Sequence, residues 1–112
     1  MAFKEVRGRV ITALRSGNFR SEDRDAEKNF LATNRMTAAE VIALLIFCRG
    51  DQYKETPHHQ IPCNIHIFTP IKIQIKWYIK VYFLSDLGAL DEGDPDAMFV
   101  SVHPSDPSGA GV

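Results

Sequence analysis

This chain of 112 residues has few of the features that commit a sequence to a special class of protein. It has only two cysteines, Cys48 and Cys63, and a single tryptophan. Two cysteines cannot form a disulfide framework, so we expect reduced thiols and a fold held by its hydrophobic core. The sequence shows no signal peptide, and its longest apolar run, Val41 to Cys48, is far too short to cross a bilayer. We therefore expect a cytoplasmic protein with no membrane partner.

The chain also lacks the short motifs that carry nucleotide or metal chemistry. It contains no glycine-rich phosphate loop, no G-x-S-x-G turn and no H-E-x-x-H helix. Four possible zinc ligands lie within nine residues, at His58, His59, Cys63 and His66. Cys63 and His66 would point to opposite faces of a strand that begins at Asn64, and no second ligand pair exists. The acidic stretch 85–97 lacks the spacing of a calcium loop. We therefore expect no metal and no cofactor.

Charge is nearly balanced over the whole chain but unevenly placed along it. The net charge of −1 does not by itself indicate a nucleic-acid-binding protein. Five of the 14 acidic residues lie in residues 85–97, which contain no basic residue. The nine remaining acidic residues stand against 13 lysines and arginines, so the rest of the chain is basic by four charges.

The N-terminal part of the chain is predicted to be helical. Phe3 to Arg15 has apolar residues at three- and four-residue spacings, and the residues around Gly17 end that helix. A second, polar helix is predicted from about Asp23 to Ala32. A third begins with the capping box T-x-x-E at Thr37 and runs through an apolar stretch. Gly50 stands where a left-handed residue is expected after this helix.

After the third helix the spacing of apolar residues changes from 3.6 to 2. A loop is predicted from Asp51 to Pro62, followed by a short strand from Asn64 to Phe68. Ile71 to Leu84 alternates strictly between apolar odd positions and polar even positions, which predicts a strand buried on one side. Because 14 residues is long for one strand, a bend or hairpin is expected near Ile73–Gln74. A last strand is predicted from Met98 to His103.

Helices that precede strands indicate an α+β domain, with helices packed on one face of a small antiparallel sheet. This single domain is expected to span residues 1–104, followed by a flexible tail over 105–112. The side chains predicted to face the helices include Ile65, Ile67, Val100 and Val102. The other face of the sheet is expected to be open.

The open face is predicted to be basic and aromatic. The side chains expected on or near it are Lys54, His66, Lys76, Tyr78, Lys80, Tyr82 and His103. Lysines neutralise phosphates, and aromatic rings stack on unpaired bases, which contributes ~1–3 kcal/mol per base. Histidine carries protons near neutral pH, and fixed cations stabilise a charged transition state. A polar outer face is also ordinary for a half-exposed strand, so a solvated surface remains the alternative interpretation.

Seven short segments occur in a characteristic order along the chain. They are L-R-S-G-N-F-R, N-F-L, N-R-M-T-A-A-E-V, D-Q-Y-K, N-I-H-I-F, W-Y-I-K-V and F-V-S-V-H-P. This ordered set covers roughly Val10 to Pro104 and resembles the MqsR-like toxins of bacterial toxin–antitoxin systems. That family shares the wider RelE-like ribonuclease architecture. The resemblance implies a metal-independent endoribonuclease that cuts messenger RNA, with a cognate antitoxin protein as its partner.

The resemblance also assigns positions to the expected site. Lys54 in D-Q-Y-K matches the family's loop lysine, and Tyr78 in W-Y-I-K matches its strand tyrosine, with Lys80 two positions on. His103 in S-V-H-P matches the basic position of the last strand. The family's catalytic glutamine has no clean counterpart in this chain. We expect these four residues to be catalytic, with RNA contacts from three neighbours on the open face, His66, Lys76 and Tyr82.

A second function stays open on the sequence alone. The same scaffold could serve as a non-catalytic protein-binding or inhibitor module, carried by a phage or plasmid. Its acidic loop, residues 85–97, would then imitate the charge of a nucleic acid. That function predicts a protein partner that is lost when Asp91, Glu92 and Asp94 are neutralised.

Overall fold

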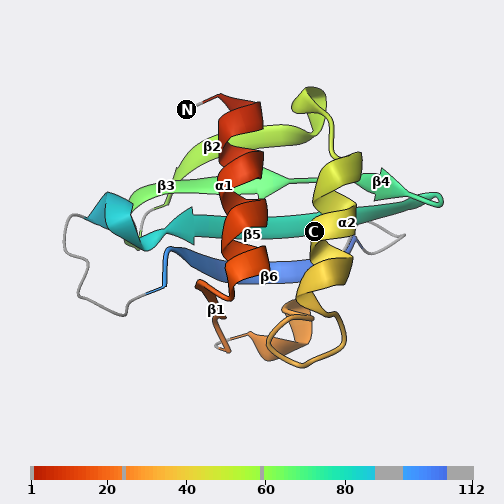
Figure 1. Cartoon of the computed structure of the whole chain (residues 1–112), viewed down its shortest axis with the longest axis horizontal. Helices are drawn as coiled ribbons and strands as arrows, with labels where there is room; N and C mark the ends of the chain where they lie inside the picture. The colour runs from red at the N-terminus through yellow and green to blue at the C-terminus, as the bar shows by residue number, and fades with distance from the viewer. Residues whose placement is uncertain (1, 24, 59, 88–94, 106–112) are drawn as a thin grey trace.

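A computed structural model describes residues 2–23, 25–58, 60–87 and 95–105. It confirms the α+β class, with two helices on one face of a six-stranded, mostly antiparallel sheet (Figure 1). Three short 3₁₀ turns, η1 to η3, connect the longer elements. In chain order the elements are α1 (Phe3–Ser16), β1 (Phe19–Ser21), η1 (Ala26–Lys28), α2 (Ala38–Phe47), η2 (Gly50–Gln52), β2 (Tyr53–His58), β3 (Ile61–Phe68), β4 (Ile71–Lys72), β5 (Ile75–Phe83), η3 (Leu84–Leu87) and β6 (Ala97–Pro104).

The two helices form where local periodicity and capping predict them. α1 ends at Gly17, whose φ of 74° is the left-handed conformation that glycine adopts without strain. α2 begins at a complete capping box, in which the side chains of Thr37 and Glu40 bond each other's backbone N–H groups. Both helices pack on the sheet through residues spaced three or four apart, among them Val6, Val10, Val41, Leu44 and Leu45.

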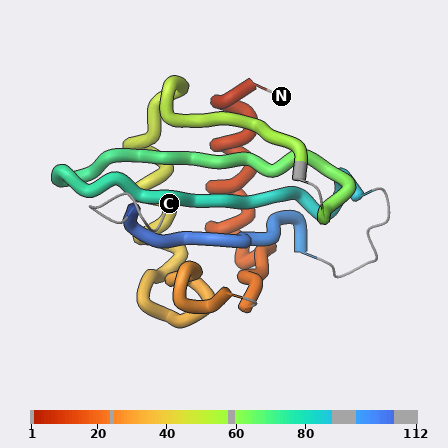
Figure 2. Tube along the Cα trace, turned by 180° about the vertical axis from the view of Figure 1, so that it is seen from behind, coloured from red at the N-terminus to blue at the C-terminus, as the bar shows by residue number. Residues whose placement is uncertain are grey.

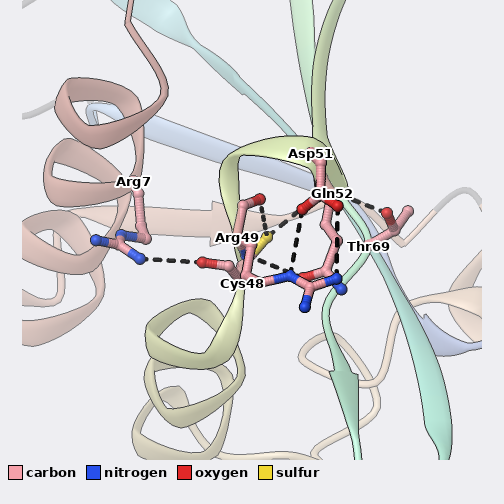
Figure 3. A network of polar contacts seen from close by, with 6 residues as sticks. All are labelled: Arg7, Cys48, Arg49, Asp51, Gln52 and Thr69. Atoms are coloured by element: carbon pink, nitrogen blue, oxygen red, sulfur yellow. Dashed lines mark hydrogen bonds and ion pairs between the residues drawn. The ribbon is translucent and has the colours of Figure 1, made fainter.

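The end of α2 differs from the prediction. No left-handed glycine closes the helix, because the chain is already extended at Cys48 and Gly50 begins η2. Polar side chains close it instead (Figure 3). Arg7 of α1 donates to the backbone oxygen of Cys48 at 3.0 Å, and Gln52 accepts from the backbone N–H of Arg49 at 2.9 Å. The helix end is thus satisfied by one tertiary contact, from Arg7, and by one local contact, from Gln52.

The polar helix predicted from Asp23 to Ala32 is wrong. Within it the described residues form only the short turn η1, and Asn29 forms an isolated parallel bridge with Val102. The fully buried Asn29 side chain donates to the backbone oxygens of Glu22 and Phe99, both at 3.0 Å. These bonds to the backbone beside β6 hold the segment at the sheet edge, and they compete with the hydrogen bonds of a helix.

The sheet has the strand order β1-β6-β5-β3-β2, with β4 paired to β5. All pairs are antiparallel except β1 with β6, which is parallel and was not predicted. β2 was also missed, because its residues were assigned to a loop. This strand lies at the sheet edge, carries Pro57 and has no apolar alternation, so only its backbone pairing with β3 reveals it.

The hairpin expected near Ile73–Gln74 is confirmed. Both residues have positive φ, 51° and 63°, and they join β4 to β5 in a two-residue turn. Ile71 pairs with Lys76 across this turn, and Lys72 pairs with Ile75. The turn therefore places odd-numbered residues of β4 on the same face as even-numbered residues of β5. Only from Trp77 to Phe83 do the odd-numbered side chains pack in the core.

Two assignments of strand faces are wrong. Ile65 and Ile67 of β3 face away from the helices and pack with Tyr82, whereas Phe68 and His66 lie on the helix-covered side. In β6 a bulge lies opposite the step from Lys80 to Val81, so Val100 joins the open face while Val102 stays in the core as predicted.

Figure 2 shows the other sheet face from behind, with no described helix or strand lying over its central part. Nothing in the structure tests the predicted single-domain boundaries, and of the predicted tail only Ser105 falls among the described residues. No helix in the described ranges is long and apolar enough to cross a membrane.

Candidate functional site

A polar hollow of about 280 Å³ lies on the open face where β2, β3 and β5 meet. Three of the residues predicted for the site line it together, namely Lys54 from β2 and Lys76 and Tyr78 from β5. The sequence separates Lys54 from Tyr78 by 24 residues, and β3 between their strands brings them to one place. The hollow therefore combines two cationic side chains with a phenol.

The strand register places two lysines in one row across the sheet. Lys54 lies opposite Ile67, which in turn lies opposite Lys80, which lies opposite Ser101. Directly paired residues point to the same face of a sheet, so all four lie on the open face. With strands roughly 4.8 Å apart, the backbones of the two lysines are about 10 Å apart. Ile67 gives the row an apolar centre between two cations.

Tyr78 connects the hollow to the last strand. It lies opposite His103 in the register, and the centroids of the two rings are 5.6 Å apart. The Lys80 ammonium is 5.5 Å from the centroid of the same tyrosine ring, within the range of a cation–π contact. Lys80 and His103 do not line the hollow themselves, but both contact Tyr78, which does line it. We call Lys54, Lys76, Tyr78, Lys80 and His103 the open-face site.

The hydrogen bonding of His103 defines which ring nitrogen can accept a proton. Its Nδ1 lies 2.9 Å from the backbone oxygen of Pro104, and a carbonyl oxygen can only accept. In the neutral ring Nδ1 therefore carries the hydrogen and Nε2 carries the lone pair. His103 is 8% exposed. Such a ring is held in place and has one nitrogen able to take a proton.

Burial raises the pKa of Tyr78 above its ordinary value. A tyrosine hydroxyl is protonated at neutral pH even without this shift, so the Tyr78 hydroxyl can donate a hydrogen bond there. It cannot serve as a base there. This separates its possible role from that of His103.

The polar network of Figure 3 anchors the turn that leads into Lys54. Thr69 donates from its hydroxyl to the backbone oxygen of Gln52 at 3.1 Å and from its backbone N–H to the same oxygen at 2.7 Å. Asp51, the one carboxylate among the described residues that line the hollow, lies 3.3 Å from the guanidinium of Arg49. The backbone before Lys54 is therefore anchored, and Arg49 offsets the charge of Asp51.

His66 was predicted to contact RNA on the open face, and that placement is wrong. It is 2% exposed on the helix-covered side, with its ring stacked on Tyr53 and packed against Phe83. Its Nδ1 lies 2.9 Å from the Tyr53 hydroxyl, and its buried Nε2 has no hydrogen-bond partner among the described residues. Strand parity puts the residue between Ile65 and Ile67 on the face opposite to theirs, so His66 cannot reach RNA on the open face.

Tyr82 lies on the open face as predicted, but as a buried residue. It is 7% exposed, packs with Ile65 and Ile67, and donates from its hydroxyl to Glu22 at 3.3 Å. Leu84 and Leu87 of η3 belong to the same apolar cluster. Stacking of an RNA base on this ring is therefore excluded, because neighbouring side chains already cover it.

Residues 88–94 of the acidic loop lie outside the described residues, and so do His59 and residues 106–112. Asp96 at the end of that loop accepts two hydrogen bonds from Arg9, at 2.9 and 2.6 Å, so it is a structural residue. Cys63 and His66 lie on opposite faces of β3, as their spacing predicted. In the described part of the chain no three His, Cys, Asp or Glu side chains are grouped to hold a metal ion.

Sequence reasoning missed several residues at this site. Ile67 lies between the two lysines, and Ser101 lies opposite Lys80. The hollow is also lined by Asp51, Gln52, Tyr53 and Thr69. Gln52 could have been found from the sequence, because it lies two positions before Lys54 and must stay close to that lysine. Ile67 and Ser101 required the strand register, which no local pattern supplies.

Comparisons of this chain with protein-family models, curated proteins and solved structures find no match. We infer its function from the side chains of the open-face site and from the resemblance seen in the sequence.

Proposed function

We propose that this protein is an RNA-cleaving toxin, a metal-independent endoribonuclease that acts at the open-face site. The observation that carries the proposal is the convergence of three lysines, a tyrosine and a histidine from β2, β5 and β6 on one uncovered sheet face. These residue types bind the phosphates of RNA and move protons near neutral pH. The sequence resemblance to MqsR-like toxins supports the same activity and a cognate antitoxin as partner.

The proposed reaction needs no atoms beyond RNA and the side chains. A base removes the proton of a 2′-hydroxyl, and the 2′-oxygen attacks the adjacent phosphorus. The bond from phosphorus to the 5′-oxygen breaks, and an acid protonates that leaving oxygen. The products are a 2′,3′-cyclic phosphate on one fragment and a 5′-hydroxyl on the other.

The roles of the side chains follow from their states. His103 is the proposed base, because its neutral form carries a lone pair on Nε2. Tyr78 is the proposed donor to the leaving oxygen or to a phosphate oxygen, because its hydroxyl is protonated at neutral pH and lines the hollow. Lys54 and Lys80 flank the centre of the site and would stabilise the negative charge that builds up on the phosphate. Lys76 would bind a neighbouring phosphate at the rim of the hollow.

The experiment that tests this proposal is an RNA digest in EDTA. The purified chain is incubated with end-labelled single-stranded RNA, and the product ends are identified by their sensitivity to phosphatase and to mild acid. His103→Ala is compared with His66→Gln, which replaces the histidine on the other face. We expect cyclic phosphate ends from the unaltered protein and a loss of about 10²–10⁴-fold in His103→Ala. His66→Gln should retain the rate per folded molecule.

Two results would contradict the proposal. One is the absence of cleavage by folded protein, both on free RNA and on messenger RNA engaged by ribosomes. The other is cleavage that His103→Ala and Tyr78→Phe leave unchanged, which would place the reaction elsewhere. The gene beside this one offers a further test of the partner, because co-expression with a true antitoxin should relieve growth arrest caused by the toxin.

A further inference from the structure

Large apolar side chains are exposed in one region of the molecule. Among the described residues, the large hydrophobic side chains classed as exposed are Ile46, Phe47, Ile71, Ile73 and Ile75. The first two end α2, and the other three belong to the β4–β5 hairpin, which extends past α2 in Figure 1. Ile71 pairs with Lys76, so its side chain points to the open face, whereas Ile73 and Ile75 lie on the α2 side of the hairpin. Single exposed apolar residues are ordinary on a protein surface, but a gathered set marks a contact surface.

A groove of about 530 Å³ lies between α2 and the hairpin, and two of the exposed residues, Ile73 and Ile75, line it. Its α2 side carries Ala39 and Ala43, one helical turn apart, whose small side chains leave the space open. Its hairpin side carries Ile75 and Trp77, with Met36 at the start of α2. Such a groove is deep and apolar enough to take several large side chains from another molecule.

The tip of the hairpin gives a second, independent observation. Ile73 has φ of 51° and is 83% exposed. Positive φ is unfavourable for a β-branched residue, and turns of this kind favour asparagine or glycine. In the isolated chain this isoleucine gains almost no burial in return for its strained backbone. Contact with a partner would supply the burial that the chain itself does not.

The charges at the rim of the groove define the partner's chemistry. The Arg35 guanidinium lies 5.3 Å from the centroid of the Phe30 ring, and the Lys72 ammonium lies 5.3 Å from that of Phe47. Neither cation has a carboxylate partner among the described residues. Glu40, the one acidic residue that lines the groove in the described part of the chain, is occupied by the capping box with Thr37. The rim therefore presents two available cations.

We propose that this groove binds an acidic amphipathic helix of another protein. Apolar side chains at positions i, i+3 or i+4, and i+7 of that helix would enter the groove, and its carboxylates would meet Arg35 and Lys72. The inference does not depend on the ribonuclease proposal. Lys72 and Ile75 face the groove, whereas Lys76 faces the site on the other side of the sheet.

The test selects peptides that bind the full chain from a displayed library of random 16-residue peptides. Peptides that also bind the Ala43→Trp variant are discarded, because this substitution fills the groove from α2. We expect enriched peptides with net negative charge and apolar residues at helical spacing. Their affinity, measured by fluorescence anisotropy, should fall by about tenfold or more in Ala43→Trp and in Lys72→Glu. Lys54→Met, on the opposite face, should leave peptide affinity unchanged.

Ile73→Asn keeps the proposal falsifiable if Ala43→Trp fails to fold. Asparagine tolerates the left-handed backbone, so this variant should unfold at the same or a higher temperature while it binds the peptides more weakly. The proposal is overturned if no acidic helical peptides are enriched, or if both Ile73→Asn and Lys72→Glu bind them as the unaltered chain does. It is also overturned if sedimentation shows a dimer that Ile73→Asn dissociates, because a second copy would then occupy the groove. RNA cleavage is measured in a separate assay, and its result does not change how the peptide-binding results are interpreted.

Discussion

The two faces of the central sheet each bury a histidine, and the surroundings of these histidines differ. On the covered face His66 lies among the Tyr53 and Phe83 rings, with its Nε2 unpartnered among the described residues. On the open face His103 lies against Tyr78, beside a row of lysines. The covered histidine is part of the packed core, whereas the other, although only 8% exposed, contacts a tyrosine that lines the polar hollow. A residue's type alone thus does not indicate its role, because the face of the sheet decides what it can contact.

The largest expected effect is on the free energy of unfolding, when a side chain on the helix-covered face of the sheet is removed. Phe83→Ala removes a fully buried ring that packs on His66 and on the Arg9 guanidinium, and should lower the free energy of unfolding by about 3–5 kcal/mol. Val100→Ala, at the half-exposed bulge of the open face, should cost less than about 1.5 kcal/mol. Urea unfolding followed by circular dichroism measures both. Equal losses would show that the two faces contribute alike.

A second prediction concerns the ion pair that ties α1 to the start of β6. Arg9→Met removes two hydrogen bonds to Asp96 and a cation over the Phe83 ring, and should cost about 1.5–3 kcal/mol. Its control is Arg49→Met, which removes an exposed pair with Asp51 and should cost less than about 1 kcal/mol. Thermal unfolding of both variants checks the difference. If Arg9→Met unfolds like the unaltered chain, the pair does not hold these elements together.

A third prediction uses pH to separate the histidines. Burial lowers the pKa of His66 in the folded state, an effect that the Glu55 carboxylate partly opposes. The unfolded chain therefore takes up this proton more readily, and stability should fall as pH drops below about 6.5, by at most about 1.4 kcal/mol per pH unit. Urea midpoints at pH 7.5 and pH 5.5 measure the loss. His66→Phe should reduce this loss, and a loss that His66→Phe leaves unchanged would refute the assignment.

The smallest expected effect concerns phosphate contacts on the open face. Lys54→Met should weaken binding of a single-stranded 2′-O-methyl RNA severalfold and reduce the slope of log affinity against log salt by about 0.7. Lys72→Met removes a lysine from the helix-covered side of the hairpin and should leave that slope unchanged. Fluorescence anisotropy over a salt series compares the two. A slope that changes equally in both variants would mean that only overall charge attracts RNA.

Much of the fold was predictable because its signals are local. The capping box at Thr37, the glycine after α1 and the hairpin at Ile73–Gln74 each depend on residues within one turn. β2 and β1 were not predictable in the same way, because backbone partners distant in sequence define them. The helix expected from Asp23 failed for a related reason, since Asn29 bonds to the backbone of Phe99, 70 positions away.

For the site, the sequence identified most of the residue types but not all of their placements. Lys54, Lys76 and Tyr78 line one hollow, and Lys80 and His103 contact Tyr78, so five of the seven expected residues lie together. The other two expected residues, His66 and Tyr82, are buried away from any ligand. The catalytic role of the five stays a prediction for the RNA digest to test.

By itself, then, the sequence determined the two helices, the alternating strand from Trp77 to Phe83 and the basic, aromatic character of its outer face. Only the tertiary structure decided which face His66, Ile67 and Val100 occupy. The physical reason is the two-residue period of a strand, in which a shift by one position moves every side chain to the opposite face. A two-residue turn and a β-bulge each make such a shift in this chain, and only the pairing of distant strands shows where they fall.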